Sequence, residues 1–219
     1  MDALCSLLAR HVEVRPPWLE DVLADRPVLH HDIALAFGGA THDLGRFAVA
    51  PSPQEAHELF EAGALWAAQT TVDEVARVSL LRAAVVGVDD PFAIARSLFV
   101  TGDTRERAAI LRALPLLRDP LGFLSLATEG CRSCVTPVFE AIACDNAYPA
   151  RWFPERAFRQ MVLEAIVTGV PIRRIVGLRV RTSDELRRMV RDYATERVAA
   201  NRSVPDDIHR LLATGGARP

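Results

Sequence analysis

The sequence has no lysine: all of its 26 basic residues are arginine. This bias is more typical of a GC-rich bacterial genome than of selection for guanidinium chemistry, so it says little about function. The 28 acidic residues bring the net charge to −2. A charge so close to zero argues against general nucleic-acid binding, which normally needs a basic domain.

Long apolar runs and a secretory leader are also lacking. The longest apolar stretches, such as residues 80–88, are interrupted by Arg82 and fall short of the roughly 20 residues that cross a bilayer. The N-terminus has neither the basic segment nor the long apolar segment of a secretory signal. We therefore expect a cytoplasmic protein without a membrane span, whose four cysteines are reduced thiols rather than disulfides.

The charge is distributed unevenly along the chain. Residues 1–150 carry 12 arginines against 20 acidic residues, a net charge of −8, whereas residues 151–219 carry 14 arginines against 8, a net charge of +6. This electropositive C-terminal third is better suited to a small anion or an acidic partner than to nucleic acid.

Helix start and stop signals recur along most of the chain and outweigh a few short β-like runs. Residues 52–55, Ser-Pro-Gln-Glu, combine a capping serine, a proline at the first helical position and a glutamate at the third. Signals of this kind predict helices over residues 53–69, 72–87, 91 onward, 104–113, 120–130, 137 onward, 154–169, 184–200 and 205 onward.

Short helices joined by short turns bury their apolar stripes by stacking on their neighbours. The sequence shows no repeat of fixed period. We therefore predict a single all-α domain over residues 1–219, an irregular α-α array or bundle that is HEAT-like or α-solenoid-like at most. Residues 26–52, rich in glycine and proline, are expected to form a loop-rich region, and residues 213–219 a frayed tail.

Several short blocks within residues 129–204 carry a family resemblance. In chain order they are Glu129–Arg132, Val138–Ala143, Asp145–Ala150, Phe153–Glu155, Gln160–Leu163, Ile175–Leu178, Asp192–Ala194, Glu196-Arg197 and Ala199-Ala200. This series of blocks resembles the EboA family. The chain departs from the family pattern at Arg159, where an asparagine is usual, and at Cys134, where a polar residue is usual.

The resemblance implies a metabolic pathway for the protein but no particular reaction. EboA proteins belong to a bacterial gene cluster that also encodes a prenyltransferase, a sugar-phosphate-cyclase-like enzyme and hydrolases, and that is associated with making or exporting secondary metabolites. The resemblance brings no reaction for the EboA member itself. It implies a role in natural-product biosynthesis, with a small-molecule pathway intermediate as the partner.

The strongest polar constellation lies in the same region. Glu140 stands in an apolar run, where a buried carboxylate costs several kcal/mol unless it is paired, and Arg132 is the expected partner. The expected catalytic residues, for acid/base chemistry without a cofactor, are Glu140, Asp145 and Tyr148. The expected substrate-binding residues are Glu129, Arg132, Asn146, Gln160, Arg188 and Asp192. The spacing of four between Arg188 and Asp192 is equally typical of solvated ion pairs on an exposed helix.

These residues lead to one main hypothesis and two alternatives. In the main hypothesis, a helical cleft formed by residues 129–197 binds, and by acid/base chemistry converts, a small anionic or prenylated intermediate. In the first alternative, the chain is a non-catalytic scaffold whose basic helix around Arg187, Arg188 and Arg191 docks a pathway enzyme or pairs two protomers. In the second, residues 30–32 (His-His-Asp) and 42–43 (His-Asp) belong to a metal-dependent phosphohydrolase, which requires further ligands to converge on one point.

Two other motifs have simpler interpretations. Cys131 and Cys134 have the spacing of half a zinc site that Cys144 and Cys5 could complete, but a second Cys-x-x-Cys is missing, which favours packed thiols. The pair at residues 89–90, Asp-Asp, lacks the further carboxylate of a prenyl-diphosphate box and is better explained as a helix cap. We therefore expect neither a bound metal nor a cofactor.

Overall fold

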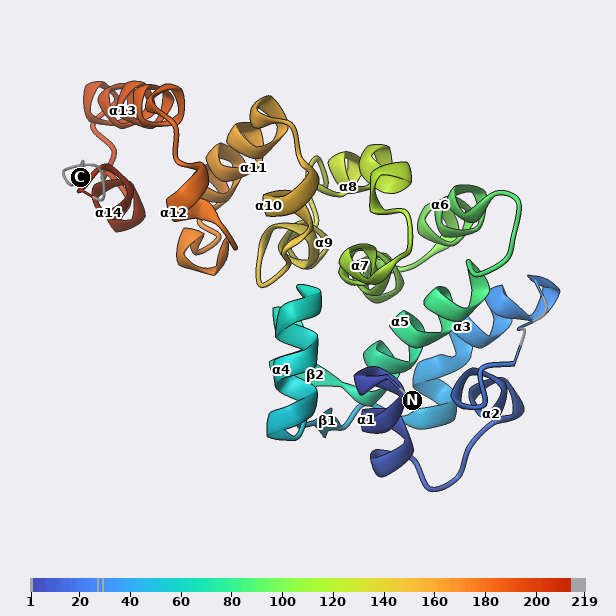
Figure 1. The fold of residues 1–219 in the computed structure, drawn as a ribbon. Coiled ribbons are helices and arrows are strands. Elements are labelled where there is room, and N and C mark those ends of the chain that lie inside the picture. The colour runs from blue at the N-terminus through green and yellow to red at the C-terminus, as the bar shows by residue number, and fades with distance from the viewer. Residues whose placement is uncertain (1, 27, 29, 214–219) are drawn as a thin grey trace.

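The chain folds almost entirely into α-helices in the computed structural model, which describes residues 2–26, 28 and 30–213 (Figure 1). The first seven helices are α1 (Ala3–His11), α2 (Pro17–Leu23), α3 (His30–Leu44), α4 (Pro53–Ala62), α5 (Val72–Ala84), α6 (Pro91–Thr101) and α7 (Thr104–Ala113). They are followed by α8 (Leu124–Gly130), α9 (Thr136–Ala143), α10 (Tyr148–Trp152), α11 (Glu155–Thr168), α12 (Leu178–Arg181), α13 (Asp184–Ala199) and α14 (Asp206–Ala213). Short 3-10 turns accompany them: η1 (Leu65–Ala68), η2 (Leu114–Leu116), η3 (Pro120–Phe123) and η4 (Ile172–Arg174). The predicted all-α class is confirmed.

A short antiparallel β-ladder joins two of the connections. Strand β1 (Ala48–Val49) pairs with β2 (Thr70–Thr71), with Ala48 opposite Thr71. Strand β2 leads directly into α5, and the backbone N–H of Val72 donates to the carbonyl of Phe47 at 3.0 Å. The ladder therefore fixes the segment before α4 against the start of α5.

The helices pack on one another in series rather than around one centre. Helix α3 packs on α5, α5 on α7, and α7 on α9, which in turn contacts α11. Helices α6, α8 and α10 lie beside this stack, and Figure 1 shows the chain progressing along it to α13 and α14 at the far end. Such stepwise stacking is the logic of an α-solenoid, in which each layer buries the apolar stripe of the next.

Several helix boundaries follow the predicted capping signals. Ser52 and Glu55 form a complete capping box at the start of α4, and Ser183 caps α13 through the N–H of Leu186. Two predicted ends are wrong, because α4 stops at Ala62, where Gly63 adopts a left-handed φ of 91°, and α5 stops at Ala84 rather than at Gly87.

The expected loop-rich region at residues 26–52 is wrong over most of its length, because α3 occupies residues 30–44. Its buried residues recur with the period of a helix and share one face: Ile33, Ala36, Phe37, Ala40 and Leu44. Packing this face on α5 outweighs the cost of the two glycines inside the helix, about 1 kcal/mol each. The predicted tail falls mostly on residues 214–219, which lie outside the described residues.

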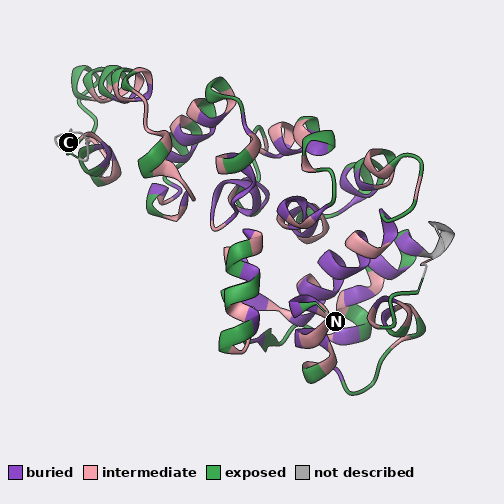
Figure 2. Cartoon of the chain, viewed as in Figure 1, coloured by how far each residue is buried: buried purple, intermediate pink, exposed green. Residues whose placement is uncertain are grey.

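Buried residues lie on the inner faces of the stacked helices (Figure 2). Nearly all of the buried apolar residues form one cluster that runs from Ala3 in α1 to Leu211 in α14. Helix α5 also buries two charged residues, Asp73 and Arg77, which are 0% and 2% exposed. Over the described residues, the structure contains no helix of the length and apolarity that a membrane span requires.

Candidate functional site

A cleft of about 690 Å³ lies between the β-ladder and helices α5, α7 and α9. Its volume falls in the range of roughly 300–1,000 Å³ that is typical of small-molecule sites. Small apolar side chains form much of its wall: Ala48, Val49, Ala50, Ala68, Ala108 and Pro137. The charged side chains among its lining residues are Glu74, Arg77, Arg105, Arg112 and Glu140. The cleft thus combines apolar surface with charged groups of both signs.

The buried carboxylate of Asp73 holds two of the arginines that line this cleft. It pairs with Nη1 of Arg77 at 2.9 Å and with Nη2 of Arg105 at 3.0 Å. The hydroxyl groups of Thr41 and Thr71 donate to it at 2.8 and 2.5 Å. Because these partners come from α3, β2, α5 and α7, one side chain connects four elements.

The surroundings of Asp73 determine its charge state. Burial would raise the pKa of this carboxyl, but the hydrogen bonds from Thr71 and Thr41 and the positive charge of Arg105 together lower it below the ordinary value. Asp73 is therefore ionised at neutral pH. Its ionised form in turn holds Arg77, whose Nε also donates to the carbonyl of Phe37 at 2.8 Å.

A second ion pair lies beside the first. Arg112 of α7 donates from Nη1 to Glu74 of α5, and its guanidinium lies 5.8 Å from the centre of the Trp66 ring. Among the described residues, neither Nε of Arg112 nor Nε of Arg105 has a hydrogen-bond partner, although both side chains line the cleft. Buried N–H donors without partners are uncommon and call for an explanation.

The third charged group occupies the α9 side of the cleft. Arg174, in η4, donates from Nη1 to Glu140 at 3.0 Å and from Nε to Asp145 at 2.8 Å. Burial alone would lower the pKa of Arg174, but the hydrogen bonds with Asp145 and Glu140 outweigh it and raise the pKa. One arginine therefore holds both acidic residues that we expected to be catalytic.

The expected pairing of Glu140 with Arg132 is wrong. Glu140 pairs with Arg174 instead, and Arg132 is exposed in the turn that follows α8. Glu140 is also less buried than its apolar neighbours suggest, because its side chain is 31% exposed where α9 borders the cleft. That exposure lets a ligand in the cleft reach Glu140.

Asn146 and Tyr148 have well-defined structural contacts next to this group. The Asn146 amide donates to the carbonyls of Leu111 and Ala141 and accepts from the N–H of Tyr148. The Tyr148 hydroxyl donates to the carbonyl of Pro120, and burial raises its pKa. Both side chains are buried, and neither is among the residues that line the cleft.

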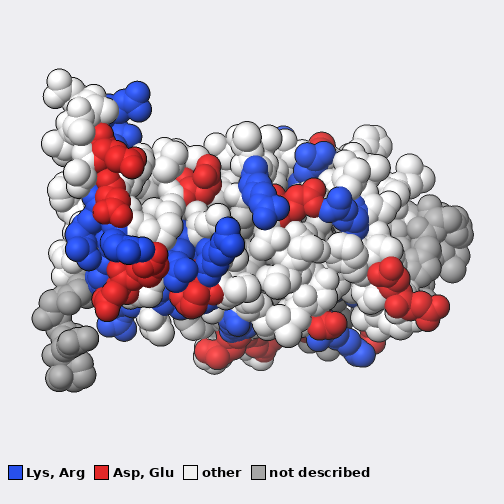
Figure 3. All heavy atoms as spheres, turned by 90° about the horizontal axis from the view of Figure 1, so that it is seen from above, with Lys and Arg blue, Asp and Glu red and all other residues white. Residues whose placement is uncertain are grey.

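The other predicted substrate-binding residues lie elsewhere on the surface. Glu129 is paired with Arg96, and Arg188 is paired with Glu185 one turn away at 2.7 Å. Gln160 and Asp192 are exposed on α11 and α13. On the face shown in Figure 3, arginine and acidic side chains are interleaved at the end that carries α13, consistent with solvated ion pairs.

The sequence contains signals for the residues that our predictions missed. Asp73 and Arg77 are four residues apart, with Val75, Ala76 and Val78 around them, a spacing that predicts an ion pair on one helix face. Arg105 and Arg112 are seven apart and so share a face of α7. Arg174 had no such signal, because it lies 34 residues from Glu140 along the chain.

The described residues hold no group of three or more histidine, cysteine, aspartate or glutamate side chains that could bind a metal. His42 is exposed beside Asp43, whereas the side chains of His30, His31 and Asp32 lie outside the described part of the structure. All four cysteines are free thiols.

The chain matches a known protein family. The family described as "Metabolite traffic protein EboA" matches residues 3–213, nearly the whole chain and well beyond the blocks at residues 129–204. The searches of curated proteins and of solved structures find no match.

Proposed function

The chain belongs to the EboA family. From the geometry of the cleft that the β-ladder, α5, α7 and α9 enclose, we propose that the protein binds a small metabolite in this cleft and carries it. The family description, metabolite traffic, supports a small-molecule role in secondary-metabolite pathways. The observation that carries the proposal is the cleft itself, in which rigidly held ion pairs face small apolar side chains.

The lining indicates the chemistry of the ligand. Arg105 and Arg112, whose side chains are 34% and 21% exposed, offer hydrogen bonds to oxygen atoms, and Glu140 accepts hydrogen bonds from hydroxyl groups. The alanine, valine and proline side chains accommodate an apolar portion. We therefore propose an intermediate with one apolar part and one oxygen-rich part, of which the prenylated intermediate expected from the sequence is one example.

The charge pairing favours carriage over conversion. Asp73, Glu74 and Glu140 are each held by an arginine. Each of these carboxylates is already engaged by a guanidinium group, so it is better placed to orient a ligand than to move its protons.

Native mass spectrometry tests this proposal. The purified chain is incubated with a small-molecule extract of the organism that encodes it, and the bound species is measured in the wild type and in Ala48→Phe. Ala48 is exposed on β1 and lines the cleft, so a larger side chain there obstructs the cleft without disturbing the core. We expect the amount of ligand bound to Ala48→Phe to be at least about tenfold lower than in the wild type, because buried apolar contact drives binding.

The matched control is Ala199→Phe, which adds the same group at an exposed position at the end of α13. Ala199→Phe should retain the ligand. Equal retention by Ala48→Phe would place the ligand outside the cleft and refute the proposal. Carriage is supported if the ligand released from the protein has the same mass as the ligand in the extract.

Acid/base conversion is the second candidate, and the position of Glu140 at the edge of the cleft favours it. The test compares turnover of the captured ligand by the wild type and by Glu140→Gln, which keeps the shape and removes the charge. A loss of turnover with unchanged binding would support catalysis. Unchanged ligand in both proteins would leave carriage as the function.

A further inference from the structure

A second cavity, of about 440 Å³, lies at the opposite end of the stack between η4, α12 and α14. Its floor is apolar: Ile172, Ile175 and Leu211 are buried, and Leu178 is half-buried. Val180, also in its lining, is 85% exposed. A volume of this size is within the range of roughly 300–1,000 Å³ for small-molecule sites.

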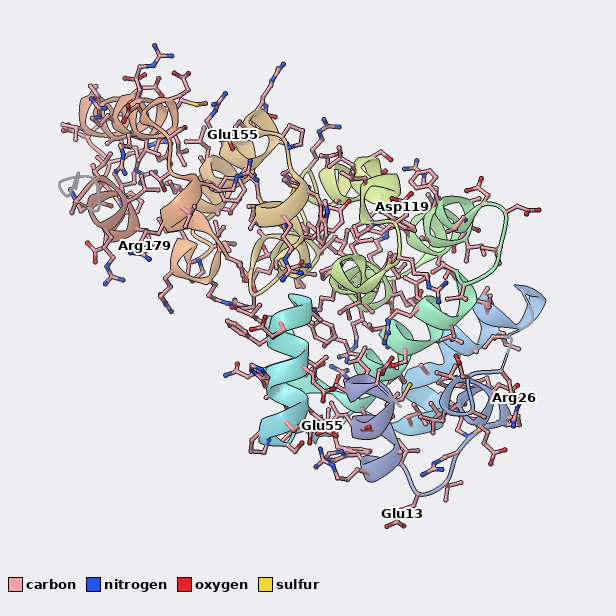
Figure 4. The ribbon with its side chains drawn as sticks, in the orientation of Figure 1. Glu13, Arg26, Glu55, Asp119, Glu155 and Arg179 are labelled. Carbon is pink, nitrogen blue, oxygen red and sulfur yellow. The ribbon has the colours of Figure 1, made fainter. Side chains whose placement is uncertain are left out.

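Three arginines surround this apolar floor: Arg173, Arg179 and Arg210. Figure 4 shows Arg179 beside α12 and α14, at the C-terminal end of the array. Within the described part of the chain, no ion pair or hydrogen bond of the Arg173 or Arg179 side chain is found, in contrast to the arginines of the first cleft.

The single acidic residue of the lining does not neutralise these charges. Asp207 accepts a hydrogen bond from the backbone N–H of Ile172 at 3.0 Å, and its other oxygen lies 4.0 Å from Arg210. Its carboxylate is therefore held against η4. Arg173 and Arg179 therefore leave a positive rim beside the apolar floor.

We propose that this cavity binds a small amphiphile whose apolar chain covers Ile172, Ile175 and Leu211 and whose acidic head, a carboxylate or phosphate, meets Arg173 and Arg179. The apolar chain loses contact with water on binding, and guanidinium groups match the geometry of both acidic heads. This site is separate from the cleft at α5, α7 and α9 and does not depend on the function proposed for that cleft.

Calorimetric titration of the full chain tests the site with three probes: octyl phosphate below its micelle concentration, octan-1-ol and inorganic phosphate. Octyl phosphate should bind at least about tenfold more tightly than either of the other two, because only it has both parts. Equal binding of octyl phosphate and inorganic phosphate would show an adventitious anion site and overturn the proposal. Failure of octyl phosphate to bind would overturn it as well.

Paired variants then locate the probe. Arg173→Gln with Arg179→Gln should weaken octyl phosphate binding about tenfold and leave octan-1-ol binding unchanged, since both residues are exposed and removing them does not disturb packing. Arg156→Gln with Arg191→Gln, two exposed arginines outside the cavity, makes the same change in net charge and should have no effect. An equal loss in the two double variants would reduce the interaction to net charge and refute the proposal.

Ala48→Phe separates this site from the first cleft. Octyl phosphate binding should be unchanged in that variant, because Ala48 lines the cleft at the β-ladder and is not in the lining of this cavity. Loss of the probe in Ala48→Phe, with retention in the Arg173 and Arg179 variant, would assign octyl phosphate to the first cleft. That outcome would overturn the second site and leave the proposed function standing.

Discussion

Replacing Asp73 by asparagine should destabilise the protein strongly, because it removes the charge that compensates Arg77 in the core. The Arg77 side chain is only 3% exposed, and Asp73 is fully buried. Breaking a buried ion pair by neutralising one partner typically costs about 3–5 kcal/mol, since the remaining charge is left without compensation. We expect Asp73→Asn to lose about that much free energy of unfolding.

Urea unfolding followed by circular dichroism measures this loss, with an unchanged m-value as the sign that both states keep their compactness. Glu185→Gln is the matched control: it breaks the exposed pair with Arg188 and should cost no more than about 1 kcal/mol. The double variant Asp73→Asn with Arg77→Met should lose less than the sum of the two single variants, because it leaves no unpaired charge from this pair. A loss below about 1 kcal/mol in Asp73→Asn would refute the assignment of Asp73 as the buried anchor.

Three further predictions follow from the structure. Because folding lowers the pKa of Asp73, its ionised form stabilises the folded state fully above the ordinary pKa of 3.8, and this stability is lost as the pH falls through the lower folded value. The free energy of unfolding, measured by urea unfolding at a series of acidic pH values, should therefore depend less on pH in Asp73→Asn than in the wild type. Gly63→Ala should cost more than Gly87→Ala, by about 1–3 kcal/mol in an equilibrium unfolding assay. Both glycines have positive φ, but a Cβ on Gly63 would lie 2.7 Å from Cβ of Ala147, whereas nothing lies within 4 Å at Gly87. Iodoacetamide should modify Cys134 first, as peptide mass mapping over time can show, because Cys134 is exposed and burial raises the pKa of the other three thiols to about 11 or 12.

The same residues that stabilise the fold also shape the cleft. Asp73 and Glu74 are adjacent in α5, and their arginine partners Arg105 and Arg112 come from α7. The stacking of α5 on α7 therefore decides where the guanidinium groups lie. A ligand in this cleft meets donors that are already held in place, which reduces the ordering cost of binding.

Local chemistry allowed the sequence to predict most helices. Capping boxes, prolines at first positions and terminal glycines act within one turn, so Ser52, Asp90 and Ser183 could be assigned without knowledge of the fold. Helix α3 was missed because glycines lower local helix propensity, and only packing of its apolar face on α5 compensates for them.

The sequence by itself determined the helical class and, through ordered blocks of residues, the family. The tertiary structure alone decided which charges meet between helices. Glu140 pairs with Arg174 rather than with Arg132, and Asp73 pairs with Arg105 across 32 residues of chain. Helical periodicity determines which residues share a face of one helix, but ion pairs between helices depend on how the helices stack, and a stack of short helices is held together by contacts between distant segments.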